Sequence, residues 1–193
     1  MKDQACIVGI GETPYTRGPG SGKSLLGLQL GAAVRAVEDA GLSNGQIDGL
    51  MPCAGLGTAE EFAANLGAKQ LRYAARVQMG GATPVASLQV AAAAVVAGIA
   101  RYVLMPAGWN GYSGRRTRDA VVAATSVLPG AAIARDYYIP HGLTAPPQWF
   151  ALMARRHMHE FGTRPEQLGA IAVAMRKHAQ LNPNAVMRGR PMT

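Results

Sequence analysis

Charged and aromatic residues are scarce in this sequence of 193 residues, and their scarcity narrows the classes of protein to consider. Only 16% of the residues are charged and 49% are apolar, so the chain is globular and has much surface to bury. Aromatic residues make up 6%, and no basic helix carries interleaved aromatics, which argues against a nucleic-acid partner. The composition indicates one α/β domain, or part of a larger one.

Cysteine is also rare, and no long apolar run is present. Cys6 and Cys53 have neither the spacing of a metal site nor that of a disulfide framework, so we expect the reducing cytoplasm. No signal-peptide pattern precedes the first apolar run. The most apolar stretch, residues 85–100, is too short and too rich in alanine to cross a bilayer, and we interpret it as a buried helix. We therefore expect no membrane partner.

Basic residues exceed acidic ones, which gives a net charge of +8. They are scattered, and their densest cluster, Arg115, Arg116 and Arg118, lies in a Gly/Ser-rich loop. A small polyanion such as a nucleotide-bearing cofactor fits this charge as well as a nucleic acid does. The alternative is that the cluster is a solvated basic loop.

The hydrophobic pattern alternates between short apolar runs and segments of helical spacing. We expect strands at 5–9, 47–52, 73–79 and 102–107, and helices at 24–40, 58–66 and 83–98. This order predicts an α/β fold with a mostly parallel sheet and helices on its faces.

The alternation of apolar runs and segments of helical spacing ends after residue 107. We therefore divide the chain into an α/β half at 1–107 and a loop and helical excursion at 108–193. The excursion contains an expected helix at 147–161 and another that Thr163 caps, with Glu166 completing a capping box. No strand follows, and we expect the domain to be incomplete at its C-terminus.

Three familiar sites are excluded by single residues or by spacing. The segment Gly18–Ser24 resembles a phosphate-binding loop, but the pattern requires glycine at position 17, which is arginine. A dinucleotide fingerprint at Gly9–Gly11 fails because position 14 is proline. The four histidines have no acidic or cysteine ligand at a useful spacing, so we expect no metal site.

The strongest local feature is the run Gly80–Leu88, where a strand turns sharply into a helix. Free backbone N–H groups and the positive end of the helix dipole meet at such a turn, where they stabilise an oxyanion or a bound carbonyl. The alternative is that the paired glycines only permit a tight turn and close packing. The residues alone do not decide between these interpretations.

This run resembles the nucleophile turn of the thiolase superfamily, in particular its lipid-transfer or sterol-carrier-type branch. Gly81-Ala82-Thr83-Pro84 falls in register with the Cys-Ala-Thr-Gly or Cys-Ala-Ser-Gly of that family. The similarity extends over essentially the whole chain, through Val8–Tyr15, Ala36–Leu42, Ile47–Leu50, Phe150–Thr163 and Asn182–Ala185. It implies the N-terminal half of a five-layer αβαβα fold, with the 83–98 helix covered by a second half.

One departure from the family changes the expected chemistry. Gly81 stands where the family has its acyl-accepting cysteine, so the covalent thiolase route is excluded and the catalytic residues are unknown, with Thr83 nearby. The resemblance implies a coenzyme A thioester as substrate, with Arg115, Arg116 and Arg118 as candidates to bind its phosphates. No covalently bound cofactor is expected.

Two functions follow from the resemblance. The first is an acyltransferase-type or lipid-transfer-type enzyme that cleaves carbon–carbon bonds of acyl-CoA by a retro-aldol route, beside a small partner protein. The alternative is a non-catalytic subunit that binds acyl-CoA or a partner. The family also implies a homodimer in which two copies of the strand Tyr73–Met79 pair.

Overall fold

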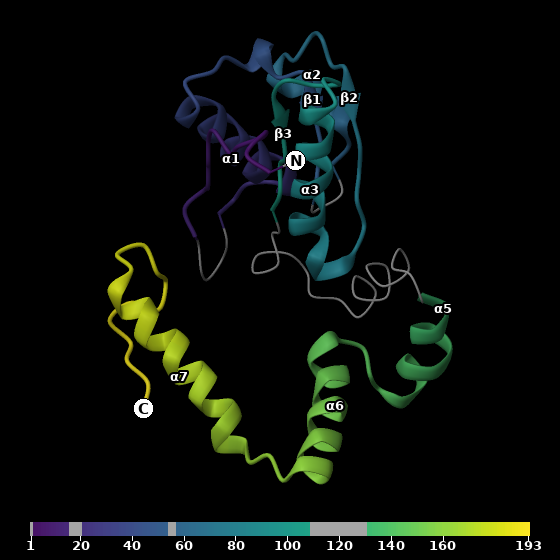
Figure 1. The fold of residues 1–193 in the computed structure, drawn as a ribbon, viewed down its shortest axis with the longest axis vertical. Coiled ribbons are helices and arrows are strands. Elements are labelled where there is room, and N and C mark those ends of the chain that lie inside the picture. The colour runs from purple at the N-terminus through teal and green to yellow at the C-terminus, as the bar shows by residue number, and fades with distance from the viewer. Residues whose placement is uncertain (1, 16–20, 54–56, 109–130) are drawn as a thin grey trace. The chain divides into compact units, whose positions relative to one another are not determined.

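The computed structural model describes residues 2–15, 21–53, 57–108 and 131–193 (Figure 1). The chain divides into two units, Met1–Ala131 and Ala132–Thr193. The first is an α/β unit and the second is helical. The α/β class and the parallel sheet expected from the sequence are confirmed, and the fold is consistent with part of a thiolase-like fold. The expected domain boundary after residue 107 stays a prediction.

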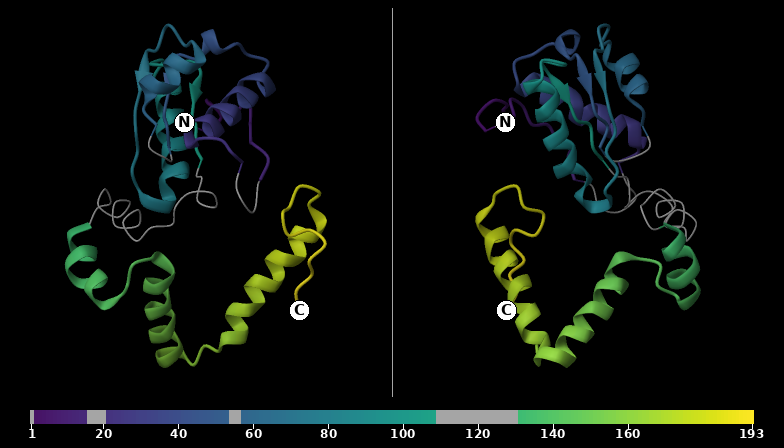
Figure 2. Two further views of the ribbon diagram at one scale, coloured as in Figure 1. Left: turned by 180° about the vertical axis from the view of Figure 1, so that it is seen from behind. Right: turned by 45° about the vertical axis from the view of Figure 1, so that its right-hand side comes forward.

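A parallel sheet forms the centre of the first unit. Its strand order is β2-β1-β3, with α1 and α2 on one face and α3 on the other (Figures 1 and 2). The chain passes from β1 through α2 to β2 on one side, and then through α3 back past β1 to β3 on the other side. Because both crossovers are right-handed, α2 and α3 lie on opposite faces of the sheet. In chain order the described elements are α1 (Leu25–Asp39), η1 (Asn44–Gln46), β1 (Gly49–Leu50), α2 (Ala59–Leu66), β2 (Tyr73–Ala74), η2 (Gly80–Ala82), α3 (Thr83–Val96) and β3 (Val103–Leu104).

The strands are shorter than the sequence pattern predicted, although backbone pairing continues beyond them. The N–H of Met51 donates to the carbonyl of Leu104 at 2.9 Å, and that of Cys53 donates to the carbonyl of Pro106 at 3.0 Å. On the other side of β1, the N–H of Ala75 donates to the carbonyl of Leu50 at 3.3 Å. The expected strands at 47–52, 73–79 and 102–107 are therefore present, but each is regular over only two residues, and in the second of them these are the first two.

The hydrophobic core of this unit lies between the sheet and the pair α1 and α2. Phe62 of α2 and Leu50 of β1 are fully buried there. The other buried members of the cluster are Ala33, Val37, Ile47, Leu66 and Leu104. Ala33 and Val37 are four residues apart and therefore lie on the same face of α1, which is the helical spacing that the sequence showed.

Side-chain caps fix the starts of the two helices that cover the core. The Ser24 hydroxyl accepts a hydrogen bond from the N–H of Gly27 at 3.0 Å, which begins α1. Thr58 and Glu61 form a capping box at α2, where the Glu61 carboxylate accepts from the N–H of Thr58 at 2.9 Å. These local signals explain why the predicted helix starts agree with the structure.

The N-terminal segment corrects the sequence analysis, because the expected strand at 5–9 is wrong. Residues 5–15 form no strand, and the apolar Ile10 is 74% exposed. The segment instead runs against α1, where the N–H of Ile10 donates to the Asp39 carboxylate at 2.9 Å. Gly9 permits this approach, since an added Cβ would lie 2.2 Å from the carbonyl oxygen of Ala36. Both positions beside β1 are occupied by β2 and β3.

Helix α3 buries a face of small residues and exposes an apolar one. Its buried residues are Thr83, Ser87, Ala91 and Ala94. The exposed side carries Val85, which is 75% accessible, together with Leu88 and Val96. The buried helix expected from the sequence is therefore buried only on its face of small residues, and the valines and leucine of the other face are accessible.

The second unit consists of helices with few buried residues. In chain order its elements are α5 (Ala131–Ile133), the π-helix η3 (Ala134–Tyr138), η4 (Ile139–His141), α6 (Pro146–Phe161) and α7 (Pro165–Leu181). Trp149 packs on Tyr138 with ring centroids 5.8 Å apart and donates its indole N–H to the carbonyl of Leu143 at 3.2 Å. Trp149 is therefore a packing residue.

The start of α7 differs from the capping box that the sequence suggested. The residue before the helix is Arg164, whose N–H donates to the Gln167 side chain at 2.7 Å. Thr163 contacts His157 instead, with its hydroxyl 2.9 Å from Nδ1. Glu166 lies in the first turn without completing a box. The pairing of Thr163 with Glu166 was therefore wrong by one residue, because proline at 165 fixes the first turn of the helix one position later.

Candidate functional site at the start of α3

The turn between β2 and α3 is held by a short 3-10 helix and one buried hydroxyl. The N–H of Ala82 donates to the carbonyl of Met79 at 3.1 Å, and the N–H of Met79 donates to the Thr83 hydroxyl oxygen at 2.9 Å. Thr83 is buried. Its hydroxyl therefore fixes the turn, which gives Thr83 a positioning role.

Two backbone donors of this turn are left over. Within the described part of the chain, no hydrogen bond involves the N–H of Gly80 or of Gly81. They precede the 14 residues of α3, whose dipole places partial positive charge at the same end. The turn can therefore stabilise negative charge on a carbonyl oxygen, which is the chemistry that the sequence left open.

The two glycines of the turn differ in what a side chain would meet. Gly80 has φ +57°, in the left-handed region that glycine adopts without strain. At Gly81, an added Cβ would have no atom within 4 Å. Space alone therefore does not exclude a side chain, or a cysteine, at position 81. The absence of a nucleophile at position 81 is therefore not explained by a lack of space for a side chain.

A buried glutamine at the carboxyl end of β3 was missed by the sequence analysis. Gln29 is 1% exposed, and its Nε2 donates to the carbonyl of Gly108 at 3.4 Å. This contact ties α1 to the residue that precedes the segment carrying the arginine cluster. The sequence did contain a signal for the burial of Gln29, because this residue lies four positions before Ala33 and eight before Val37, on the buried face of α1.

Of the residues that the sequence proposed, the structure places only those of the turn. Gly81 and Thr83 lie together at the start of α3. Arg115, Arg116 and Arg118 lie outside the described residues, so their role in binding phosphate stays a prediction. In the described ranges, no group of three or more His, Cys, Asp or Glu side chains could hold a metal ion. Likewise, none of the described helices combines the length and hydrophobicity needed to span a membrane.

Cys53 is the described cysteine closest to the carboxyl edge of the sheet, but its environment does not suit a nucleophile. It follows β1 and is buried, and its Sγ lies 3.7 Å from the carbonyl oxygen of Pro106. Burial raises the pKa of the Cys53 thiol, and a backbone hydrogen bond lowers it only in part. The thiol therefore stays protonated at neutral pH and does not substitute for a cysteine at Gly81.

We expect Cys53 to resist alkylation while the chain is folded. With iodoacetamide at pH 8, the exposed Cys6 should react and Cys53 should react only after unfolding. Since the folded pKa is raised, the contribution of the neutral thiol to stability is complete below the unfolded pKa of about 8.5 and is lost as pH rises through the folded pKa. Mass spectrometry of the modified peptides measures both rates, and equal rates in the native protein would contradict this account.

Proteins of known activity resemble the chain over almost its whole length, although no protein-family model matches the sequence. A steroid side-chain-cleaving aldolase of Thermomonospora curvata is 37% identical over 190 residues, which are 98% of this chain and 48% of the relative. A 17-hydroxy-3-oxo-4-pregnene-20-carboxyl-CoA lyase of Mycobacterium tuberculosis is 36% identical over 195 residues, which are 100% of this chain and 50% of the relative. An acetyl-CoA acetyltransferase of Methanothermobacter thermautotrophicus is 32% identical over 198 residues, 96% of this chain and 47% of the relative.

Homologues of the chain are thus aldolases, lyases and acetyltransferases. A solved structure of an Ltp2-ChsH2(DUF35) aldolase agrees with the fold at a TM-score of 0.83 and 37% identity, over 97% of this chain and 46% of that one. The chain spans about half the length of the curated relatives it matches. The acetyltransferases support the thiolase-like relationship in general terms, whereas the lipid-transfer or sterol-carrier-type branch stays a prediction.

Proposed function

We propose that the chain is part of an aldolase that cleaves a carbon–carbon bond of an acyl-CoA thioester by a retro-aldol reaction. The observation that carries this proposal is the turn at the start of α3, which keeps two free N–H donors and has no nucleophilic side chain at Gly81. Such a turn supports chemistry that builds up charge on a carbonyl oxygen and needs no acyl-enzyme. The names of two relatives, the aldolase of Thermomonospora curvata and the lyase of Mycobacterium tuberculosis, are in accord with it.

The reaction can be written with the turn as the site that stabilises charge. A base removes the proton of a hydroxyl group on the β-carbon, the C–O bond becomes a carbonyl, and the bond between the α- and β-carbons breaks. Its electron pair moves into the thioester as an enolate, which is then protonated at the α-carbon. The N–H groups of Gly80 and Gly81 would donate to the enolate oxygen. No bond to the protein forms at any stage.

The substrate class that we propose is a β-hydroxyacyl-CoA with a bulky hydrocarbon portion. One relative is described as cleaving a steroid side chain, and the other is a lyase of a hydroxylated pregnene carboxyl-CoA. Products would be a ketone and a shortened acyl-CoA. Carbon and hydrogen balance, because the hydroxyl proton is formally transferred to the α-carbon and no oxidant is needed.

The experiment is a cleavage assay on the intact protein, with a tertiary β-hydroxyacyl-CoA as substrate. Chromatography with mass spectrometry should show ketone and shortened acyl-CoA in equal amounts, and no acyl group on residues 79–84. An acyl adduct in that peptide would overturn the proposal. So would tight binding of the thioester without any product, alone or with a partner, which is the result expected of a non-catalytic binding subunit.

We propose that Arg115, Arg116 and Arg118 bind the phosphates of coenzyme A. The net charge of +8 and the density of the cluster support this. Replacing all three by serine should weaken CoA binding at least about 10-fold at low salt, since the loss of even one hydrogen bond to a charged group costs about 1.5–3 kcal/mol. The loss should shrink at high salt, where screening already reduces the attraction. Unchanged affinity in a low-salt titration would favour a solvated loop.

We further propose a homodimer through the segment Tyr73–Met79, and a small partner protein as in the two-protein name of the Ltp2-ChsH2(DUF35) aldolase. The edge position of β2 supports the dimer. Because the N–H groups of Tyr73 and Ala75 donate toward β1, that of Ala74 points to the free edge.

The free edge of β2 gives a matched pair of variants for the dimer. Ala74→Pro should lower the mass measured by light scattering from dimer to monomer and keep the fold, because only an edge donor is lost. Ala75→Pro removes the bond to Leu50 and should unfold the sheet instead. A monomeric parent protein, or a dimeric Ala74→Pro variant, would contradict the proposed pairing.

A further inference from the structure

The two long helices of the second unit expose apolar stripes that nothing in this unit covers. Neither α6 nor α7 contains a buried residue. On α6 the exposed apolar residues Phe150, Met153 and Phe161 recur at helical spacing, and Met153 is 65% accessible. On α7 the exposed residues Leu168, Ile171 and Met175 do the same. These six residues are called the elbow surface.

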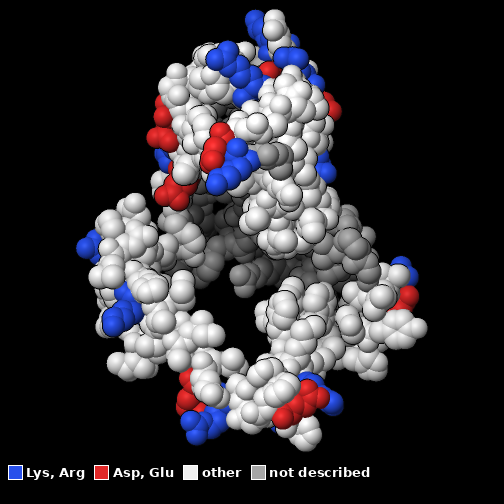
Figure 3. Space-filling model, viewed as in Figure 1, with Lys and Arg blue, Asp and Glu red and all other residues white. Residues whose placement is uncertain are grey.

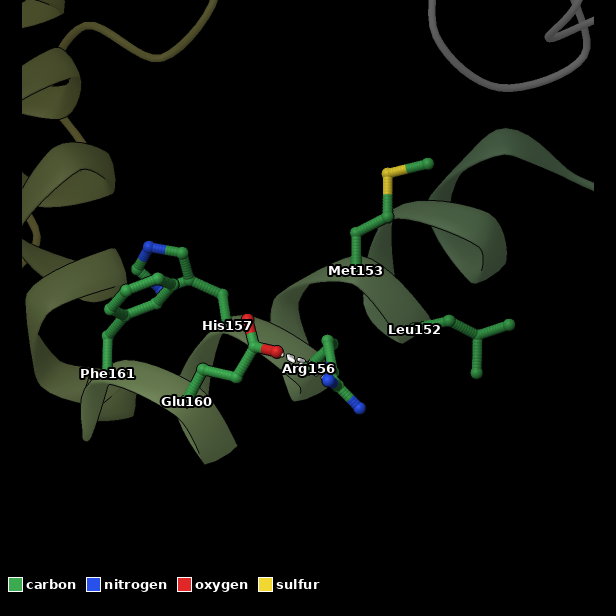
Figure 4. Close-up of a pocket in the computed structure, with 6 residues that line it drawn as sticks. All are labelled: Leu152, Met153, Arg156, His157, Glu160 and Phe161. Carbon is green, nitrogen blue, oxygen red and sulfur yellow. Dashed lines mark hydrogen bonds and ion pairs between the residues drawn. The ribbon is translucent and has the colours of Figure 1, made fainter.

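The stripes of the two helices are continuous at the bend between them. A hollow of about 330 Å³ there is lined by both helices, through Met153, Ala154, His157, Met158, Thr163 and Leu168. A second hollow of about 480 Å³ adjoins it on α6 and shares Met153 and His157 (Figure 4). Figure 4 shows Met153, His157 and Phe161 projecting from the same side of α6. The elbow surface is thus concave at its centre, with room for a side chain of a partner.

Ordinary polar contacts hold the walls of these hollows in place. The Thr163 hydroxyl lies 2.9 Å from Nδ1 of His157, and the His157 ring packs on Phe161 with centroids 4.7 Å apart. Nε of Arg156 donates to Glu160 at 2.6 Å. The polar groups at the rim are therefore engaged with one another, so the apolar stripe is what a partner would bury.

Basic charge predominates in the unit that carries the elbow surface. Residues 132–193 contain eight Lys or Arg and three Asp or Glu side chains, a net charge of +5. Each of the three acidic residues, Asp136, Glu160 and Glu166, pairs with an arginine of the same unit. Five basic residues have no acidic partner in this unit: Arg155, Arg176, Lys177, Arg188 and Arg190. In Figure 3 the coloured side chains of this unit gather at the bend and the ends, and white surface lies between them.

We propose that the elbow surface docks an acidic amphipathic helix of a partner protein. Two helices that meet at a bend, each with an apolar stripe, are complemented by a third helix whose apolar side chains repeat at the same spacing. The net charge of +5 on this unit attracts acidic residues of such a helix, which favours an acidic partner over a second copy of this chain carrying the same +5. A concave centre suits an inserted side chain more than it suits a flat lipid surface. The inference rests on the partner proposed above and is independent of the retro-aldol reaction.

The experiment measures binding of two synthetic helical peptides to the whole chain at low salt. One peptide has leucine at helical spacing with glutamate on its flanks, and the other has lysine in place of every glutamate. Fluorescence anisotropy should show that the Leu/Glu peptide binds at least about tenfold more tightly, and circular dichroism should show that it gains helix on binding. Raising the salt concentration should weaken it.

Matched aspartate variants locate the binding on the chain. Met153→Asp and Ile171→Asp lie in the elbow surface, and each should weaken binding of the Leu/Glu peptide about tenfold or more, since each removes an apolar side chain that the peptide would bury. Ala151→Asp and Ala170→Asp are exposed controls on other sides of the same helices and should change it less than about twofold. Aspartate costs more helix propensity at the two alanine positions than at Met153 and Ile171, so a general loss of helix would appear in the controls at least as strongly by circular dichroism.

Three outcomes would overturn the proposal. Equal binding of both peptides would show that the partner is not selected for acidic charge. Equal effects of the elbow and control variants would show that the peptide binds elsewhere on the chain. Tighter binding to vesicles rich in anionic lipid, lost in the same elbow variants, would identify a membrane surface instead. Cleavage of the acyl-CoA substrate is scored separately, so loss of peptide binding in a variant that still turns over substrate distinguishes a docking defect from failure of the proposed reaction.

Discussion

Replacing Phe62 by alanine should remove a large part of the stability of the α/β unit. The Phe62 side chain is fully buried between α1, α2 and the sheet, in one cluster with Leu50 and Val37. Truncating a buried phenylalanine costs about 3–5 kcal/mol, because the lost burial and the remaining cavity add together. Domains of this size are stable by about 5–15 kcal/mol, so the variant should unfold at a much lower denaturant concentration.

Urea unfolding followed by circular dichroism measures this loss, with a matched control on the second unit. Phe150 is 64% exposed on α6, and Phe150→Ala should change the free energy of unfolding by less than about 0.5 kcal/mol. If Phe62→Ala does not fold at all, Phe62→Leu should give a smaller but measurable loss, because it removes less of the ring volume. Equal losses for the variants at 62 and 150 would show that the core does not lie where the structure places it.

Replacing Gly80 by valine should lower turnover about 100-fold if the turn at the start of α3 stabilises the enolate. Gly80 has φ +57°, a conformation that a β-branched residue adopts only with strain. The substitution should rotate the N–H groups of Gly80 and Gly81 away from the oxygen that they would bind. Removing a donor of this kind typically costs about 10²–10³ in kcat. The effect should fall on kcat, since the charge on the oxygen exists only during the reaction.

Gly81→Ala is the matched control in the same turn. Its added Cβ would meet no atom within 4 Å, and the N–H of residue 81 is kept, so turnover should stay within about threefold of the parent. Stability of both variants is compared by thermal unfolding, which separates lost chemistry from lost fold. A large loss in Gly81→Ala with an unchanged Gly80→Val would show that the charged oxygen is bound somewhere other than this turn.

Local residue patterns predicted the helices and their ends. The starts of α1 and α2 follow from Ser24 and Thr58, whose side chains bond to backbone N–H groups only a few residues away. Pro84 in the first turn of α3 and the alanine-rich run after it indicated that helix as clearly. The turn at Gly80 and Gly81 was also visible, since paired glycines between a strand and a helix are a local signal. Such features need no knowledge of distant parts of the chain.

Tertiary contacts decided what those patterns left open. The run Ala5–Gly9 has the composition of a strand, but no local signal says which neighbours a strand will have, and β2 and β3 occupy both sides of β1. Gln29 became a buried contact of Gly108 only when residues 79 positions apart were brought together. Thr163 turned away from α7 to meet His157, because the cap that forms depends on where the preceding helix places its own side chains.

The sequence by itself determined the α/β class, the helices around the sheet, and the absence of a nucleophile at position 81. Each of these depends on side-chain chemistry or on spacing within a few turns of chain. The tertiary structure alone decided the strand order, the N–H groups left free at the turn, and the apolar stripes exposed on α6 and α7. Those properties depend on which distant segments pack against one another. The residues of a single segment do not specify that choice.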